Sequence, residues 1–121
     1  FYEWRKTAAG KQPYYIRSHD GAPLAFAGLW ERWPGPDGAP VETCTILTTE
    51  PNELMAPLHN RMPVILPRDA YATWLDPKTD DASRLQPLLG PCPSESLRAD
   101  PVSKRVNNPA NDTPECINPQ I

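Results

Sequence analysis

Two residues of this 121-residue sequence stand out as candidates for acid–base chemistry. His59 lies in Leu58-His59-Asn60-Arg61-Met62-Pro63, between a predicted helix and a predicted strand, where active-site groups are often found. Its imidazole could transfer protons near neutral pH. Glu3 interrupts the aromatic run Tyr2-Glu3-Trp4 on a strand face that should be partly buried. The residues alone leave two alternatives open, a turn histidine that hydrogen-bonds the backbone and an exposed edge-strand glutamate.

The remaining candidates for chemistry are weaker. His19 precedes Asp20-Gly21, a tight-turn signal, and should be an exposed loop histidine. Cys44, Cys92 and Cys116 are widely spaced and form no CxxC pair, so we expect no metal site and reduced thiols. The motifs GxxxxGK(S/T), GxGxxG, GxSxG and HExxH are absent from the sequence, and we expect no cofactor.

The elements that must position these residues are short. Seventeen of the 121 residues are prolines, about 14% against a usual share of roughly 5%, and this content excludes long helices. The sequence contains no apolar run of about 18 residues, so no membrane span is predicted. Strands are predicted over 1–5, 13–18, 24–33, 41–49 and 63–66, with one more near 100–106, and short helices over 50–58, 68–75 and 80–89. Residues 7–11 and 20–21 should be turns and 34–40 a loop, while Gly28 should mark a bulge or close backbone approach.

These elements predict an α+β fold in one domain over residues 1–121. An antiparallel strand meander should come first, followed by short helices and an irregular, proline-rich tail. The sequence opens without methionine, directly on a strand-like run, so we expect a piece of a longer chain. No secretion leader is visible at its start.

Charge is distributed unevenly along the sequence. The net charge of −3 argues against a protein that binds nucleic acid over its whole surface. Residues 1–33, however, hold five Lys/Arg against three Asp/Glu, a net +2, and residues 34–121 hold seven against twelve, a net −5. The basic residues of the first segment are Arg5, Lys6, Lys11, Arg17 and Arg32. They form either a local patch, where a tryptophan could stack on a base, or a solvated rim.

Several segments follow one another in a specific order. They are Phe1-Tyr2-Glu3-Trp4, Lys11-Gln12-Pro13-Tyr14-Tyr15-Ile16, Ala27-Gly28-Leu29-Trp30-Glu31, Thr45-Ile46-Leu47-Thr48-Thr49, His59-Asn60-Arg61-Met62-Pro63-Val64-Ile65-Leu66 and Pro101-Val102-Ser103. This order resembles the SOS-response-associated peptidase (SRAP) family over essentially the whole chain. The Tyr-Glu-Trp and His-x-Arg-Met-Pro segments together make the resemblance specific.

The resemblance implies a function. SRAP proteins bind abasic sites in single-stranded DNA and cross-link to them through a cysteine at the mature amino terminus. Its amine forms a Schiff base with the open sugar aldehyde, its thiol closes a thiazolidine ring, and the peptidase name refers to self-processing that exposes the cysteine. By this likeness Glu3 and His59 are the catalytic residues, and the substrate- or DNA-binding residues are Trp4, Thr48 and Arg61.

The resemblance also implies that part of the family's domain lies outside this sequence. The nucleophile belongs to the amino-terminal half, so we expect the carboxy-terminal part of an SRAP domain that lacks cross-linking activity alone and exposes apolar strand edges. The three cysteines cannot substitute, because ring closure needs an amine and a thiol on one residue. The expected partner is single-stranded DNA with abasic sites, without metal or membrane, for a cytoplasmic protein that is monomeric at full length. A non-catalytic SRAP remnant that binds DNA and an unrelated α+β domain remain alternatives.

Overall fold

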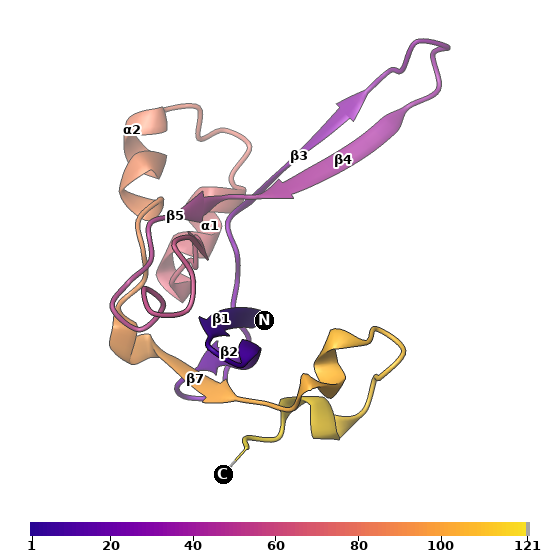
Figure 1. The fold of residues 1–121 in the computed structure, drawn as a ribbon. Coiled ribbons are helices and arrows are strands. Elements are labelled where there is room, and N and C mark those ends of the chain that lie inside the picture. Colours follow the sequence, from indigo (N-terminus) through magenta and orange to yellow (C-terminus); the bar gives the residue numbers. More distant parts are fainter. Residues whose placement is uncertain (121) are drawn as a thin grey trace. The chain divides into compact units, whose positions relative to one another are not determined.

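The chain divides into two compact units, each of which has its own antiparallel strands. The structure is a computed structural model that describes residues 1–120. One unit contains Phe1–Leu24, Pro51–Arg61 and the segment from Pro93 onward, and the other contains Ala25–Glu50 and Met62–Cys92. Small sheets and short helices along the chain confirm the predicted α+β class (Figure 1).

The first unit is organised around a three-stranded antiparallel sheet. Its strands are β1 (Tyr2–Thr7), β2 (Gly10–Ser18) and β7 (Leu97–Pro101), in the order β1-β2-β7. A two-residue turn joins β1 to β2, and Gly10 adopts a φ of +113°, which a residue without Cβ tolerates. The central strand β2 supplies the fully buried Ile16. The register that this short hairpin imposes therefore fixes which side chains of β1 face which side chains of β2.

The segment after β7 folds back onto that strand. It contains two 3-10 turns, Lys104–Asn107 and Pro114–Ile117. Val102 forms an isolated antiparallel bridge with Pro119, and the Gln120 amide donates to the Pro101 carbonyl at 2.7 Å. The proline-rich tail is thus irregular, as predicted, but it is tied to the sheet by backbone hydrogen bonds. The strand predicted near 100–106 begins earlier, at Leu97.

The segment between Pro51 and Arg61 is a series of turns, and the helix predicted over 50–58 is wrong. Two helix-like hydrogen bonds form, from the Ala56 amide to Asn52 and from the His59 amide to Met55, each at 2.9 Å. Pro57 lacks the N–H that the intervening helical bond would need, so a regular helix cannot continue through it. The segment is held instead by Asn52 and Met55, which are both buried.

The second unit contains the other four strands and both α-helices. Its strands are β3 (Gly28–Trp33) paired with β4 (Val41–Ile46), and β5 (Thr48–Thr49) paired with β6 (Met62–Pro63). Ala27, Val64 and Leu66 form its buried cluster, against which Leu47, Tyr71, Trp74, Leu88 and Leu89 pack. The loop predicted over 34–40 joins β3 to β4.

The strands do not form one continuous meander. β2 has β1 and β7 as its sheet neighbours, whereas β3 pairs with β4 in a separate sheet. The strand predicted over 41–49 is interrupted at Leu47, because its amide donates to Ala27 and its carbonyl accepts from Val64, each at 2.9 Å. The predicted close approach at Gly28 is confirmed, since a Cβ there would lie 3.0 Å from the Thr45 carbonyl oxygen.

The two α-helices are short, as the prolines require. The helix predicted over 68–75 is a 3-10 turn, Arg68–Ala70, followed by α1 (Tyr71–Leu75). The one predicted over 80–89 begins as α2 (Ala82–Leu85) and tightens to a 3-10 turn around Pro87. Asp81 caps α2 by accepting from the Ser83 amide at 2.9 Å, and this hydrogen bonding lowers the pKa of its carboxyl. Within residues 1–120, no helix combines the length and apolarity that crossing a membrane requires.

Met55 should stabilise the first unit more than its place in a loop suggests. Its side chain is 0% exposed, so Met55→Ala should lower the free energy of unfolding by about 2–5 kcal/mol. Leu75→Ala is the control, because that side chain is 76% exposed and should cost little. Urea unfolding of the three proteins tests this prediction, and equal costs for the two variants would contradict it.

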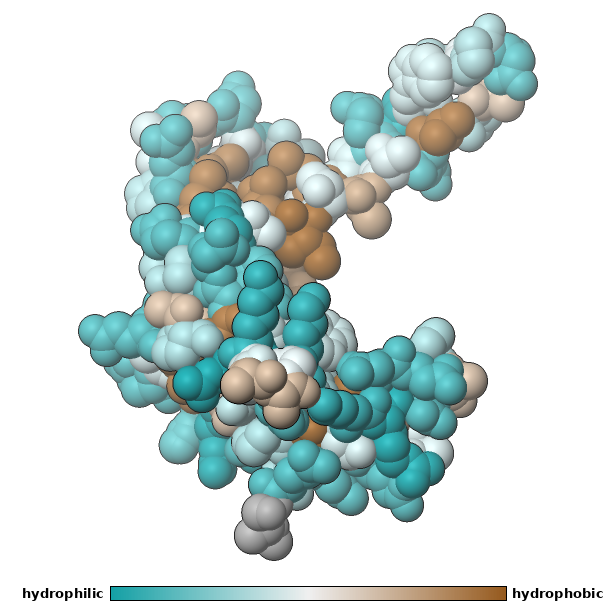
Figure 2. Space-filling view, viewed as in Figure 1, coloured by the Kyte–Doolittle hydropathy of each residue, from teal (hydrophilic) through white to brown (hydrophobic). Residues whose placement is uncertain are grey.

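The β3–β4 hairpin exposes apolar side chains that a dye should detect. Trp30 is 72% exposed and Trp33 54%, and Figure 2 shows a small hydrophobic patch on the otherwise pale and teal hairpin. Replacing both tryptophans with threonine should lower the fluorescence of a bound hydrophobic dye, while the free energy of unfolding changes by less than about 0.5 kcal/mol. Glu31→Gln on the same hairpin should leave the dye signal unchanged. If the double tryptophan variant gives the same dye signal as the unmodified chain, the dye binds elsewhere and the prediction is wrong.

Candidate active site

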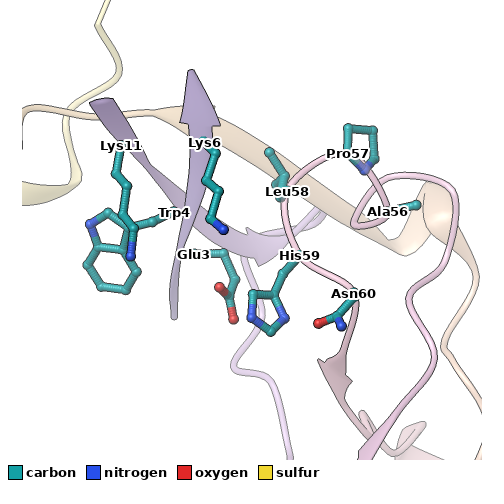
Figure 3. A pocket seen from close by; sticks show the side chains of 9 residues that line it. All are labelled: Glu3, Trp4, Lys6, Lys11, Ala56, Pro57, Leu58, His59 and Asn60. Carbon is teal, nitrogen blue, oxygen red and sulfur yellow. The ribbon is translucent and has the colours of Figure 1, made fainter. Parts of the chain in front are cut away.

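Glu3 and His59 line one cleft, although 56 positions separate them in the sequence. The cleft has a volume of about 560 Å³ and lies within the first unit. Its lining residues come from the β1–β2 hairpin and from the turn-rich segment before Arg61; they are Glu3, Trp4, Lys6, Lys11, Ala56, Pro57, Leu58, His59 and Asn60. Figure 3 shows the Glu3 carboxylate and the His59 imidazole pointing toward the same space.

Strand β1 positions Glu3 through its pairing with β2. Glu3 lies opposite Tyr14 in the ladder and is half-buried. Neighbouring residues of a strand point to opposite faces, yet Glu3 and Trp4 both line the cleft. β1 is an edge strand of this sheet in the described part of the chain, and the turn-rich segment before Arg61 supplies the remaining lining of the cleft.

Aromatic contacts and hydrogen bonds fix β1 on the Trp4 side. The rings of Tyr2 and Tyr15 lie 5.6 Å apart between centroids, and the Trp4 indole N–H donates to Asn107 Oδ1 at 2.8 Å. The Tyr2 hydroxyl donates to the Cys116 carbonyl at 3.4 Å. Burial raises the pKa of this hydroxyl, and Cys116, Tyr15 and Asp112 raise it further, which keeps the hydroxyl a donor.

Backbone contacts hold the imidazole of His59. The His59 amide donates to the Met55 carbonyl at 2.9 Å, so the buried Met55 anchors the residue. The ring atom Nδ1 lies 3.1 Å from both the amide nitrogen and the carbonyl oxygen of Arg61. Nδ1 can therefore accept from the amide when it is unprotonated and donate to the carbonyl when it is protonated. In both states the ring keeps a backbone partner, and Nε2 is the nitrogen available to a substrate.

Of the other three predicted site residues, only Trp4 lines this cleft, beside Glu3. Arg61 is exposed and does not line it, although its backbone holds His59. Thr48 belongs to the second unit, where it pairs with Pro63 between β5 and β6, and it does not line the cleft.

Sequence reasoning missed the contribution of two lysines to this cleft. Lys6 and Lys11 were expected only as members of a basic patch, but both line the cleft and lie opposite each other in the hairpin ladder. The signal was present in the sequence, because a two-residue turn after Thr7 sets Lys6 against Lys11.

The cleft has the composition of an acid–base site without a metal ligand set. Within residues 1–120, no group of three or more His, Cys, Asp or Glu side chains is placed to hold a metal ion. Cys44 is exposed, Cys92 is partly buried and Cys116 is buried, and none of them lines the cleft. A carboxylate and an imidazole in one cleft can together donate and remove protons during addition to a carbonyl carbon and during loss of water from the resulting adduct.

Comparisons with known proteins agree with this architecture. The sequence model of the SOS response associated peptidase (SRAP) family matches residues 1–109. The chain is 47% identical over 118 residues to the abasic site processing protein YoqW of Bacillus subtilis, covering 97% of this chain and 53% of that protein. It is 35% identical over 139 residues to the abasic site processing protein HMCES of Gallus gallus, covering 98% of this chain and 41% of that protein.

A solved structure shows the same fold. A crystal structure of a protein from Bacteroides thetaiotaomicron superposes with a TM-score of 0.87 at 30% sequence identity, over 100% of this chain and 53% of that one. The chain thus spans about half the length of the relatives that it matches. The family match over residues 1–109 and the relatives that align along nearly the whole chain show that it belongs to the SRAP family.

Proposed function

We propose that this chain supplies the acid–base half of an abasic-site cross-linking centre, in which Glu3 and His59 catalyse covalent attachment to single-stranded DNA. The observation that carries the proposal is that these two residues line one cleft. The relatives named abasic site processing proteins support the substrate class. Because the chain spans about half of their length, the nucleophile is assigned to a cysteine outside these 121 residues, as the family resemblance implies.

The reaction needs proton transfers at each step. The cysteine amine adds to the aldehyde carbon of the ring-opened sugar and forms a carbinolamine. Loss of its hydroxyl as water gives a C=N bond, and the thiol sulfur then adds to the same carbon while its proton passes to nitrogen. The thiazolidine ring closes without an oxidant or reductant. One of the two cleft residues removes a proton from the attacking amine and the other donates to the departing hydroxyl.

The backbone contacts of His59 suit it to this work. The Arg61 amide and carbonyl both lie 3.1 Å from Nδ1, so the imidazole can change protonation state without losing its partner. The ring thus stays oriented while Nε2 exchanges a proton with the reacting group. Trp4 offers an aromatic surface on the same cleft, on which a base or sugar could stack.

Glu3→Gln and His59→Ala should each slow cross-linking. In a full-length SRAP protein in which these 121 residues form the matching part, the rate should fall by roughly 100-fold, as expected for loss of a general acid or base. Denaturing gels that follow cross-linking to an abasic oligonucleotide with time measure this rate. Glu53→Gln and His19→Ala are the matched controls, because both residues are exposed and neither lines the cleft.

Two results would decide between the proposal and a binding module without chemistry. Wild-type cross-linking rates in both cleft variants would remove Glu3 and His59 from catalysis. Binding of undamaged single-stranded DNA, measured in parallel, shows whether the cleft still holds a strand.

Arg61→Ala should separate the side chain of this residue from its backbone. The substitution retains the amide and carbonyl that hold His59 but removes a positive charge. Equilibrium binding to undamaged single-stranded DNA should weaken, and the slope of log affinity against log salt should decrease by about 0.7. Fluorescence anisotropy at several salt concentrations measures both quantities. An unchanged slope would show that the guanidinium makes no phosphate contact.

A further inference from the structure

We infer that Lys6 and Lys11 form a phosphate-binding pair at the Glu3–His59 cleft, which holds the backbone of a single-stranded nucleic acid there. This inference rests on the proposed function, because it assigns the groups that would hold the strand while its sugar reacts. Both lysines are exposed, line the cleft and come from adjacent strands. Figure 3 shows their side chains extending from β1 and β2 toward the side on which Glu3 and His59 lie.

The pairing of two like charges is the first argument. Lys6 and Lys11 are direct partners in the antiparallel ladder, so their side chains project from the same face of the hairpin. Like charges in such positions destabilise a hairpin. Folding therefore does not account for this arrangement, whereas a shared anion placed between the two ammonium groups would relieve the repulsion.

The lack of a carboxylate partner is the second argument. Ion pairs among the described residues include Arg17–Asp100 at 3.0 Å, Arg32–Glu42 at 3.9 Å and Arg105–Glu115 at 3.1 Å. Within this described part of the chain, no carboxylate lies within ion-pair distance of Lys6 or Lys11. Of the five basic residues in the first 33, two are therefore neutralised locally while the cleft lysines keep their charge for a ligand.

The remaining lining residues favour a phosphodiester over another anion. The Trp4 ring, which its hydrogen bond to Asn107 fixes, offers a stacking surface beside the two charges. A cleft of about 560 Å³ is large enough for a nucleotide. Charge together with an aromatic face is the combination by which single-stranded nucleic acids are held, whereas an acidic peptide would use the charges alone.

The test uses a full-length SRAP protein in which these 121 residues form the matching part, because the proposed centre includes a cysteine outside them. Binding of a short single-stranded dT oligonucleotide is measured by anisotropy over a range of salt concentrations. The Lys6→Gln/Lys11→Gln variant should bind about 10-fold more weakly at low salt, and its log–log salt slope should be smaller by about 1.4. The control is Arg5→Gln/Lys78→Gln, which removes two exposed charges that do not line the cleft.

Three further measurements sharpen the result. An oligonucleotide with an uncharged methylphosphonate backbone should bind the unmodified chain and the lysine variant equally. An acidic peptide of equal charge should bind the unmodified chain more weakly than dT does. Lys11→Glu should raise the melting temperature, since opposite charges then face each other, while weakening dT binding further than Lys11→Gln does.

Several outcomes would overturn the inference: no dT binding by the unmodified chain at low salt, equal losses in the lysine and control variants, or stronger binding of the acidic peptide. Its failure is distinct from failure of the proposed function. If the lysine variant binds normally while Glu3→Gln and His59→Ala still slow cross-linking, the cleft catalyses but holds the strand by other groups. If the reverse is found, the lysines hold a strand on which Glu3 and His59 do not act.

Discussion

The two-sided pairing of β2 is the constraint on which the described cleft depends. This strand joins β1 on one side to β7 on the other, and its Ile16 is fully buried. The pairing with β1 sets Glu3 opposite Tyr14 and Lys6 opposite Lys11, so one register places the acidic and the basic groups together. A slip of one residue would exchange the faces of every side chain on β1. The short turn before Gly10 prevents that slip.

The other wall of the cleft depends on a buried side chain in a segment without regular secondary structure. The carbonyl of Met55 accepts hydrogen bonds from the amides of Leu58 and His59, at 2.8 and 2.9 Å. The Asn52 side chain in turn accepts from the Met55 amide at 3.0 Å. A loop held in this way can present an imidazole as firmly as a helix could. Pro57 prevents the helix, but it does not loosen the segment.

The sequence predicted local features well and long-range pairing poorly. Turn chemistry and alternation were sufficient for the β1–β2 hairpin, whereas the helix predicted over 80–89 becomes a 3-10 turn at Gln86–Leu88. They could not show that β2 pairs with β7, which follows it by some eighty positions, because a strand's partner leaves no trace in its own periodicity. The break at Leu47 was hidden for the same reason, since Ala27 and Val64 compete for its backbone groups.

The candidate site was predictable in part. Glu3 and His59 were identified from their unusual contexts and from the family's motifs, and the structure brings them to one cleft. The contacts of the His59 imidazole with the Arg61 amide and carbonyl could not be predicted from the sequence, because they depend on the backbone conformation of Arg61 and not on its side chain. Thr48 belongs to the other compact unit, and its role near the site stays a prediction of the family's motif.

The C-terminal tail has a consequence for how the boundary of this domain is drawn. The family match ends at residue 109, which retains Asn107 and its hydrogen bond to the Trp4 indole. The fold continues beyond that point, because Cys116 is buried and the backbone near Pro119 bridges back to Val102. A chain cut where the sequence signature stops would keep the motif and lose part of the packing that supports it. The folded part of this chain therefore extends further than the segment that the family model recognises.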